Sequence, residues 1–89
     1  MPVEIIYSRD ALRQLKKLSP TVAKRIVIKI TVNAKQENPL LRAKSLQGRL
    51  AGKYRYRIGE YRVIFKIDDS GKVCVLMILA IKHRKDVYK

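Results

Sequence analysis

The feature that most constrains this 89-residue chain is a pair of strand-like stretches joined by Gly59-Glu60. Residues 53–58 alternate between basic and apolar side chains, and residues 61–67 are rich in aromatic and β-branched ones, which is typical of strands. A glycine at the first central position suits a two-residue type II′ turn, and such a turn fixes the register of the strands it joins. The sequence therefore predicts an antiparallel β-hairpin.

The predicted hairpin gathers basic side chains on one face. Because alternate side chains of a strand share a face, Lys53, Arg55 and Arg57 point the same way. The two-residue turn places Arg57 directly opposite Arg62, where like charges are destabilising. A phosphate would relieve this conflict, because guanidinium groups match its geometry. Pairing with local acids is the alternative, but the acids nearby are too few for the surrounding cations, so we interpret this face as an anion site.

Two helices are predicted in the first half of the chain, after a short strand over Val3–Tyr7. Ser8 caps the first helix, over residues 9–18, where apolar residues recur at helical spacing. Ser19-Pro20 begins the second helix, because serine is a favoured N-cap and proline a favoured first helical residue. The resulting helical hairpin ends near Asn38-Pro39.

Residues 26–32 fit two kinds of secondary structure. They alternate and are β-branched, as in a strand, yet the apolar residues between Val22 and Ala34 also form one helical stripe. The start signal favours the helix, since propensity is a weak prior that packing overrides.

The remainder completes one α+β domain over residues 1–89. Residues 40–52 form a connector, and a turn at residues 68–71 precedes a last strand over residues 72–82. The unbroken apolar run of that strand is typical of burial on both faces, which indicates a central place in the sheet. The predicted order is β-α-α-β-β-β, with two N-terminal helices packed on one face of a small, mainly antiparallel four-stranded sheet.

The charge balance is unusual for so small a domain: 21 Lys and Arg residues face 7 Asp and Glu residues, for a formal net charge of +14. Self-repulsion on this scale opposes the compact state, so we expect an anionic partner such as RNA, DNA, an anionic membrane or an acidic protein. A generally basic surface without a partner is the alternative.

The apolar run over residues 73–81 is far too short to span a bilayer, and no signal peptide opens the chain, so no membrane association is expected. Cys74 is the one cysteine and lies within this run, so we expect a buried thiol and no internal disulfide. A reducing compartment and a soluble, cytoplasmic protein fit these observations.

A second basic group follows the last strand, where Lys82-His83-Arg84 precedes Tyr88. Histidine changes its charge near neutral pH, so His83 is a candidate general acid or base, and a surface histidine is the alternative. The sequence contains no P-loop, nucleophile elbow, paired-carboxylate motif or metal-ligand spacing, so neither a metal nor a cofactor is expected. RNA allows chemistry with cations, a phenol and an imidazole, because its own 2′-hydroxyl attacks the adjacent phosphate.

Two segments, GEYRVIF at residues 59–65 and HRKDVY at residues 83–88, resemble the RelE branch of the RelE/ParE toxins of bacterial and archaeal toxin–antitoxin systems. The connector and the helical hairpin fit as well, so the resemblance covers nearly the whole chain. It implies a metal-independent, ribosome-dependent endoribonuclease that cleaves mRNA in the ribosomal A site by 2′-hydroxyl attack and inhibits translation. It also implies a cognate antitoxin with an acidic C-terminal segment. The toxin–antitoxin complex is expected to bind operator DNA through the antitoxin.

The resemblance extends to single residues of the hairpin and the C-terminus. Arg55 and Arg57 resemble basic residues of the family's first hairpin strand, and Arg62 resembles its transition-state-stabilising arginine. Tyr88 resembles the C-terminal tyrosine proposed as a base or as a stacking group.

The general acid is the position at which this chain departs from the family. The arginine that is proposed as general acid in the family aligns with Lys82. A lysine can donate a proton, but it does not form the paired hydrogen bonds that a guanidinium group makes to a phosphate. His83 is the alternative acid, as in related toxins, and Arg84 fits a second basic position. The predicted catalytic set is Arg62, Lys82, His83, Arg84 and Tyr88, and the predicted RNA-binding set is Lys53, Arg55 and Arg57.

Two other functions are compatible with this sequence: a ParE-like DNA gyrase inhibitor of the same fold, and a non-catalytic nucleic-acid-binding module. The combination of Arg57, Arg62, His83 and Tyr88 favours the nuclease, because a gyrase poison needs no nuclease site.

Overall fold

The computed structural model describes residues 3–85. The elements follow the order β1 (Val3–Tyr7), α1 (Arg9–Lys16), α2 (Pro20–Ala34), β2 (Ala43–Ser45), the 3₁₀ turn η1 (Gly48–Leu50), β3 (Tyr54–Ile58), β4 (Tyr61–Asp69) and β5 (Cys74–His83). The predicted α+β class and the predicted succession of two helices and a C-terminal sheet are confirmed.

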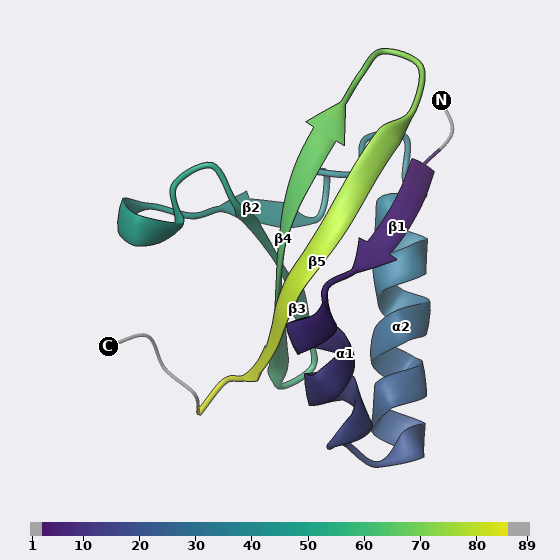
Figure 1. The fold of residues 1–89 in the computed structure, drawn as a ribbon, viewed down its shortest axis with the longest axis vertical. Coiled ribbons are helices and arrows are strands. Elements are labelled where there is room, and N and C mark those ends of the chain that lie inside the picture. The colour runs from purple at the N-terminus through teal and green to yellow at the C-terminus, as the bar shows by residue number, and fades with distance from the viewer. Residues whose placement is uncertain (1–2, 86–89) are drawn as a thin grey trace.

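The sheet has five strands in the order β1-β5-β4-β3-β2 (Figure 1). β1 runs parallel to β5, and the other neighbouring pairs are antiparallel. Four strands are predicted from the sequence, and the additional one is β2, which pairs with β3 inside the predicted connector. Its three residues are too few for their alternation to stand out from a loop. β5 lies inside the sheet, between β1 and β4, as its apolar run indicates.

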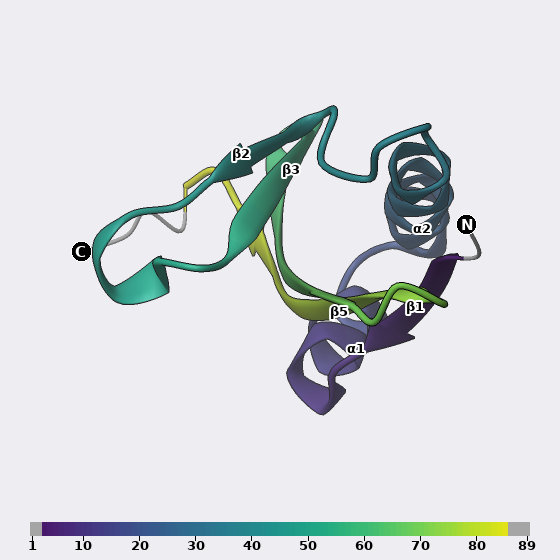
Figure 2. The same ribbon diagram turned by 90° about the horizontal axis from the view of Figure 1, so that it is seen from above.

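Both helices lie on one side of the sheet, as predicted, whereas η1 extends on the opposite side (Figures 1 and 2). The two predicted N-caps are present: the Ser8 and Ser19 hydroxyl oxygens accept hydrogen bonds from the N–H groups of Ala11 and Val22, at 3.0 and 3.3 Å. The helices end before their predicted ends, α1 at Lys16 and α2 at Ala34.

The core lies between the helices and the sheet. Ile26 and Ile30 of α2 are fully buried there, which confirms the helix over residues 26–32. The Tyr56 ring stacks on Phe65 with 4.3 Å between ring centroids, and its hydroxyl donates a hydrogen bond to the Pro39 carbonyl oxygen at 2.6 Å. Within residues 3–85, neither helix is long and apolar enough to cross a membrane.

Candidate nucleic-acid interface

The β3–β4 hairpin has the register that the sequence predicts. Ile58 pairs with Tyr61, and Arg57 pairs with Arg62, across the two-residue turn. Gly59 has a φ of +57° and Glu60 does not share the positive φ, which is the pattern of a type II′ turn;. A side chain at Gly59 would be strained by this conformation, so the glycine sets the register of the arginines.

The hairpin and the last strand bring three cations into one row. Arg57 of β3 lies opposite Arg62 of β4, and Arg62 lies opposite Lys82 of β5. Residues directly opposite in an antiparallel pair share a face, with Cβ atoms about 5 Å apart. A second row on that face begins with Lys44 of β2 opposite Arg55 of β3. We call these five residues, Lys44, Arg55, Arg57, Arg62 and Lys82, the basic face.

An irregularity in β5 decides which C-terminal residue joins the basic face. Ile64 pairs with Ala80 but Phe65 pairs with Ile78, so Leu79 is an extra residue in the ladder. Such a β-bulge reverses the facing of every residue beyond it relative to a regular strand. Lys82 therefore lies beside Arg62; without the bulge, Lys82 would point toward the helices.

Helix α1 and its N-cap, Ser8, hold this bulge from the opposite side of the sheet. The Ser8 hydroxyl donates a hydrogen bond to the Leu79 carbonyl oxygen at 3.0 Å. The Ile81 N–H group donates one to the Gln14 side-chain oxygen at 2.6 Å. Both contacts satisfy backbone groups that a regular ladder would pair. Helix α1 therefore helps to keep the Lys82 side chain on the basic face.

Two groups on the basic side of the sheet are buried, the Ile64 side chain and the Arg55 Nε atom. Ile64 is only 3% exposed, although it lies on the face away from the helices and outside the main core cluster. Beside it, opposite in the ladder, the Arg55 Nε atom is buried without a hydrogen-bond partner. A buried donor without a partner is costly, and an anion bound at this face would supply the missing acceptor.

The acidic residues of the hairpin lie at its two ends. Asp68 lies six residues beyond Arg62 on β4, about 20 Å along the strand;. Glu60, at the turn, contacts His83 and Arg84 instead, at 3.3 and 3.7 Å. Like charges directly opposite across strands are destabilising. A polyanion crossing the strands would be attracted by the positive charge that the row gathers.

His83 lies on the opposite face of the sheet from Arg62 and Lys82. It pairs with Tyr61, whose ring packs against the core, and the two rings meet edge to face with centroids 5.1 Å apart. The structure therefore brings together Arg57, Arg62 and Lys82 of the predicted site residues and does not place His83 among them.

The remaining predicted site residues lie around this row. Lys53, half-buried, immediately precedes β3, and its carbonyl oxygen accepts a hydrogen bond from the Leu46 N–H group at 3.0 Å. Arg84 is exposed and leans toward Glu60. Tyr88 lies outside the described residues.

A model of the ParE toxin of the type II toxin–antitoxin system parDE matches residues 5–88 of the chain. The chain belongs to this toxin family. Toxin RelG of Mycobacterium tuberculosis is 34% identical over 89 residues, which are 100% of this chain and 99% of RelG. The resemblance to RelE/ParE toxins that the two sequence segments suggest is thereby confirmed.

Solved structures of toxin–antitoxin complexes share the fold of this ParE-family toxin. The complex RelBE2 of Mycobacterium tuberculosis matches with a TM-score of 0.79 at 33% identity, over 94% of this chain and 100% of the matched one. The archaeal RelE–RelB complex of Pyrococcus horikoshii matches with a TM-score of 0.74 over 98% and 100% of the two chains, and its 24% identity supports the fold alone.

Lys44 is a member of the toxin's basic face that the sequence did not single out. It faces Arg55 because β2 joins the sheet, and β2 is the strand that was not predicted. The alternation of Ala43, Lys44 and Ser45 is the only signal in the sequence, and it is too short to distinguish a strand from a loop.

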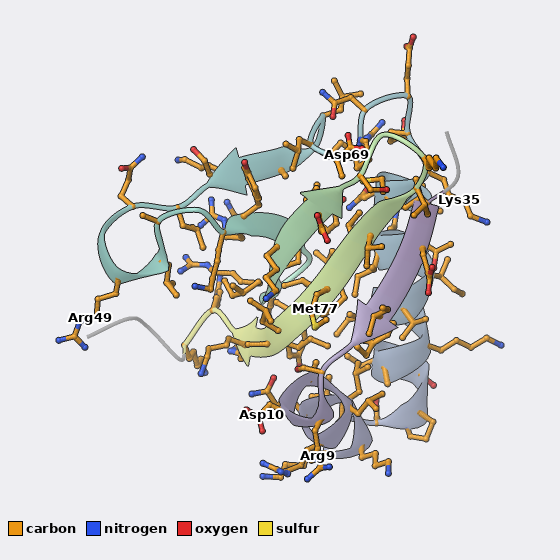
Figure 3. All side chains as sticks on the ribbon, turned by 45° about the horizontal axis from the view of Figure 1, so that its top comes forward. Arg9, Asp10, Lys35, Arg49, Asp69 and Met77 are labelled. Carbon is orange, nitrogen blue, oxygen red and sulfur yellow. The ribbon has the colours of Figure 1, made fainter. Side chains whose placement is uncertain are left out.

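A hollow of about 680 Å³ lies at the far end of the toxin and includes no residue of the basic face. Lys35 and Asp69, which help to line it, lie at the opposite end of the molecule from Arg49 of η1 (Figure 3). Cys74 also lines it, and this thiol is only 4% exposed. Burial, and then the charges of Asp69 and Asp68, raise the pKa of Cys74, which disfavours the reactive thiolate;. Among residues 3–85, no three His, Cys, Asp or Glu side chains are grouped as metal ligands.

Proposed function

We propose that this toxin is a ribosome-dependent endoribonuclease that cleaves mRNA in the ribosomal A site and so inhibits translation. The observation that carries the proposal is the row formed by Arg57, Arg62 and Lys82 across three strands. Three adjacent cations match the charge that accumulates on a phosphate under attack, and a rigid sheet holds them before the reaction begins.

The proposed reaction uses the RNA's own 2′-hydroxyl. Its oxygen forms a bond to the adjacent phosphorus, the bond to the 5′-oxygen of the next nucleotide breaks, and the products are a 2′,3′-cyclic phosphate and a 5′-hydroxyl. Arg57 and Arg62 stabilise the extra negative charge of the pentacovalent transition state. Lys82 gives a proton to the leaving oxygen, and Tyr88, assigned by its sequence position, accepts the proton of the 2′-hydroxyl. Lys53, Arg55 and Lys44 bind the flanking phosphates, and Arg84 adds positive charge at the end of β5.

The expected protein partner is an antitoxin with an acidic segment, and a groove between the helices supports this part of the proposal. The groove has a volume of about 480 Å³ and is lined mainly by aliphatic side chains of α1 and α2. Leu12 and Ile28 are 46% and 51% exposed there. Lys16 and Lys24 also line the groove, so an amphipathic acidic segment complements both its apolar surface and its charge;. Binding of operator DNA would then depend on the antitoxin.

A reconstituted translation reaction with toeprinting of the mRNA tests the enzymatic proposal. We expect the toxin to stop translation and to cut the mRNA within the codon in the A site, and only when ribosomes are present. Translation that continues on intact mRNA would refute the nuclease. Inhibition of DNA supercoiling by gyrase, without RNA cleavage, would instead support the ParE-like function, and nucleic-acid binding without either effect would support the non-catalytic module.

A further inference from the structure

The end of β5 is tied to the β3–β4 turn by three contacts that meet at Glu60. The Glu60 carbonyl oxygen accepts a hydrogen bond from the Arg84 N–H group at 2.7 Å. Its carboxylate contacts the His83 Nε2 atom at 3.3 Å and the Arg84 guanidinium at 3.7 Å. These contacts lie directly beside the row of cations, because Lys82 precedes His83 and Arg62 follows the turn.

Both ring nitrogens of His83 are engaged in the free toxin. The Lys85 N–H group donates a hydrogen bond to His83 Nδ1 at 3.1 Å, so Nδ1 carries no proton;. The proton of the neutral ring is then on Nε2, where it is donated to the Glu60 carboxylate;. A ring held in this way has no nitrogen turned toward the basic face, from which the sheet separates it.

We propose that His83 is a positioning residue rather than the general acid: with Glu60 it forms a clasp that fixes the end of β5. The clasp holds the end of β5 against the β3–β4 turn and so keeps Lys82 beside Arg62. This inference rests on the proposed nuclease function for its effect on activity, but the clasp itself is a property of the free protein.

Substitution of His83 by glutamine separates the two roles. Glutamine keeps an N–H group near the position of Nε2 and can still donate to Glu60, but it does not act as an acid or base. A positioning role predicts that cleavage by His83→Gln stays within about threefold of wild type, with an unchanged pH profile, whereas His83→Ala loses about tenfold. A general acid contributes about 10²- to 10⁴-fold, so an equal, hundredfold loss in both variants would overturn the proposal.

Glu60 provides the matching half of the test. Glu60→Ala should lose about as much cleavage activity as His83→Ala, and the double variant should lose no more than the worse single variant, because both changes open the same clasp. Glu60→Gln, which keeps an acceptor for Nε2, should restore most of the activity. Multiplicative losses in the double variant would show that the two residues act separately and would overturn the clasp.

NMR of the free toxin tests whether the clasp between His83 and Glu60 forms, without the need for a cleavage assay. Nitrogen-15 shifts of the imidazole should show the proton on Nε2, and Glu60→Ala should change these shifts and speed exchange of the Lys85 amide. A proton on Nδ1, or shifts that Glu60→Ala leaves unchanged, would refute the clasp. If wild-type toxin leaves mRNA intact, the nuclease proposal fails while this measurement still decides the clasp. Thermal unfolding of each variant identifies any loss of fold.

Discussion

Arg62 is the middle cation of the row, since it lies opposite Arg57 on one side and opposite Lys82 on the other. It is half-exposed, so its aliphatic stem adds little to the core. We expect Arg62→Ala to lower the rate of mRNA cleavage by about 100-fold or more, because a group that stabilises transition-state charge typically contributes that much. The free energy of unfolding should change by less than about 1 kcal/mol.

Lys66 offers a matched control for Arg62. It is an exposed cation on the same strand, four residues further along, and its side chain lies on the same side of the sheet;. It is not one of the five residues of the basic face. Lys66→Ala removes the same net charge and should change cleavage by less than about threefold. Equal losses in the two variants, measured by single-turnover cleavage, would show that general charge matters and that the row does not.

Tyr56 links the core to the alkaline stability of the toxin. Burial, and then the charge of Cys74, raise the pKa of the Tyr56 phenol above its ordinary value near 10;. The native state therefore keeps a proton that the unfolded chain releases, so this contribution to stability is complete below pH 10 and is lost as the pH rises further. Burial also raises the pKa of Tyr7, which acts in the same direction.

We expect the free energy of unfolding to fall between about pH 9 and pH 11, because the pKa values of Cys74, Tyr7 and Tyr56 are all raised in the native state;. Tyr56→Phe should lose about 1 kcal/mol at neutral pH, through its hydrogen bond to Pro39, but should show a smaller alkaline decline;. Urea unfolding followed by circular dichroism measures both effects. An alkaline decline of equal size in Tyr56→Phe would contradict this assignment.

At the scale of elements, the bulge in β5 determines the composition of the basic face, and α1 supports it. Gln14→Met leaves the Ile81 N–H group without its acceptor, which should cost about 1–3 kcal/mol;. If Lys82 has the role proposed for it, its displacement should also lower mRNA cleavage by about tenfold or more. Urea unfolding and hydrogen exchange of the Ile81 amide measure the structural part.

Two neighbouring variants control this experiment. Gln14→Glu keeps a side-chain oxygen at the acceptor position and should recover most of the stability and activity. Arg13→Ala removes an exposed ion pair with Asp10 at 3.1 Å and should change the stability by no more than about 0.5 kcal/mol;. A Gln14→Met variant that matches wild type in both measurements would show that the bulge does not need the helix.

Helix α2 shows what sequence signals decide at this scale. Its β-branched residues 26–32 would suit a strand, but the Ser19 cap and Pro20 begin a helix, and Ile26 and Ile30 then face the core one turn apart. Boundary signals and a helical stripe therefore outweighed local β propensity. The end of α2 carries no comparable signal, and the prediction there was several residues too long.

For the whole molecule, the net charge of +14 is less informative than its distribution. The basic face lies on the side of the sheet away from the helices, while Asp68 and Asp69 lie at the far end of β4. The basic face is thus separated from these two carboxylates, which favours the steering of a polyanion toward it.

We expect binding of a short single-stranded RNA to weaken steeply with salt. If the five side chains of the basic face each contact a phosphate, the logarithm of the affinity should fall with that of the salt concentration with a slope of about −3.5;. Arg57→Ala should make the slope shallower by about 0.7, whereas Lys29→Ala, an exposed cation of α2, should leave it unchanged. Fluorescence anisotropy across a salt series gives the slope, and equal slopes for both variants would argue against a defined face.

The sequence by itself determined the hairpin, its turn and the Arg57–Arg62 pair, because a glycine in a two-residue turn fixes register locally. It also determined both helix starts, which depend on neighbouring residues. The tertiary structure alone decided that Lys44 joins the arginines, and that of the predicted C-terminal residues Lys82 lies beside Arg62 while His83 faces the helices. A bulge held by α1 and a three-residue edge strand cause this arrangement, and both depend on contacts between segments far apart in the chain, which no local pattern encodes.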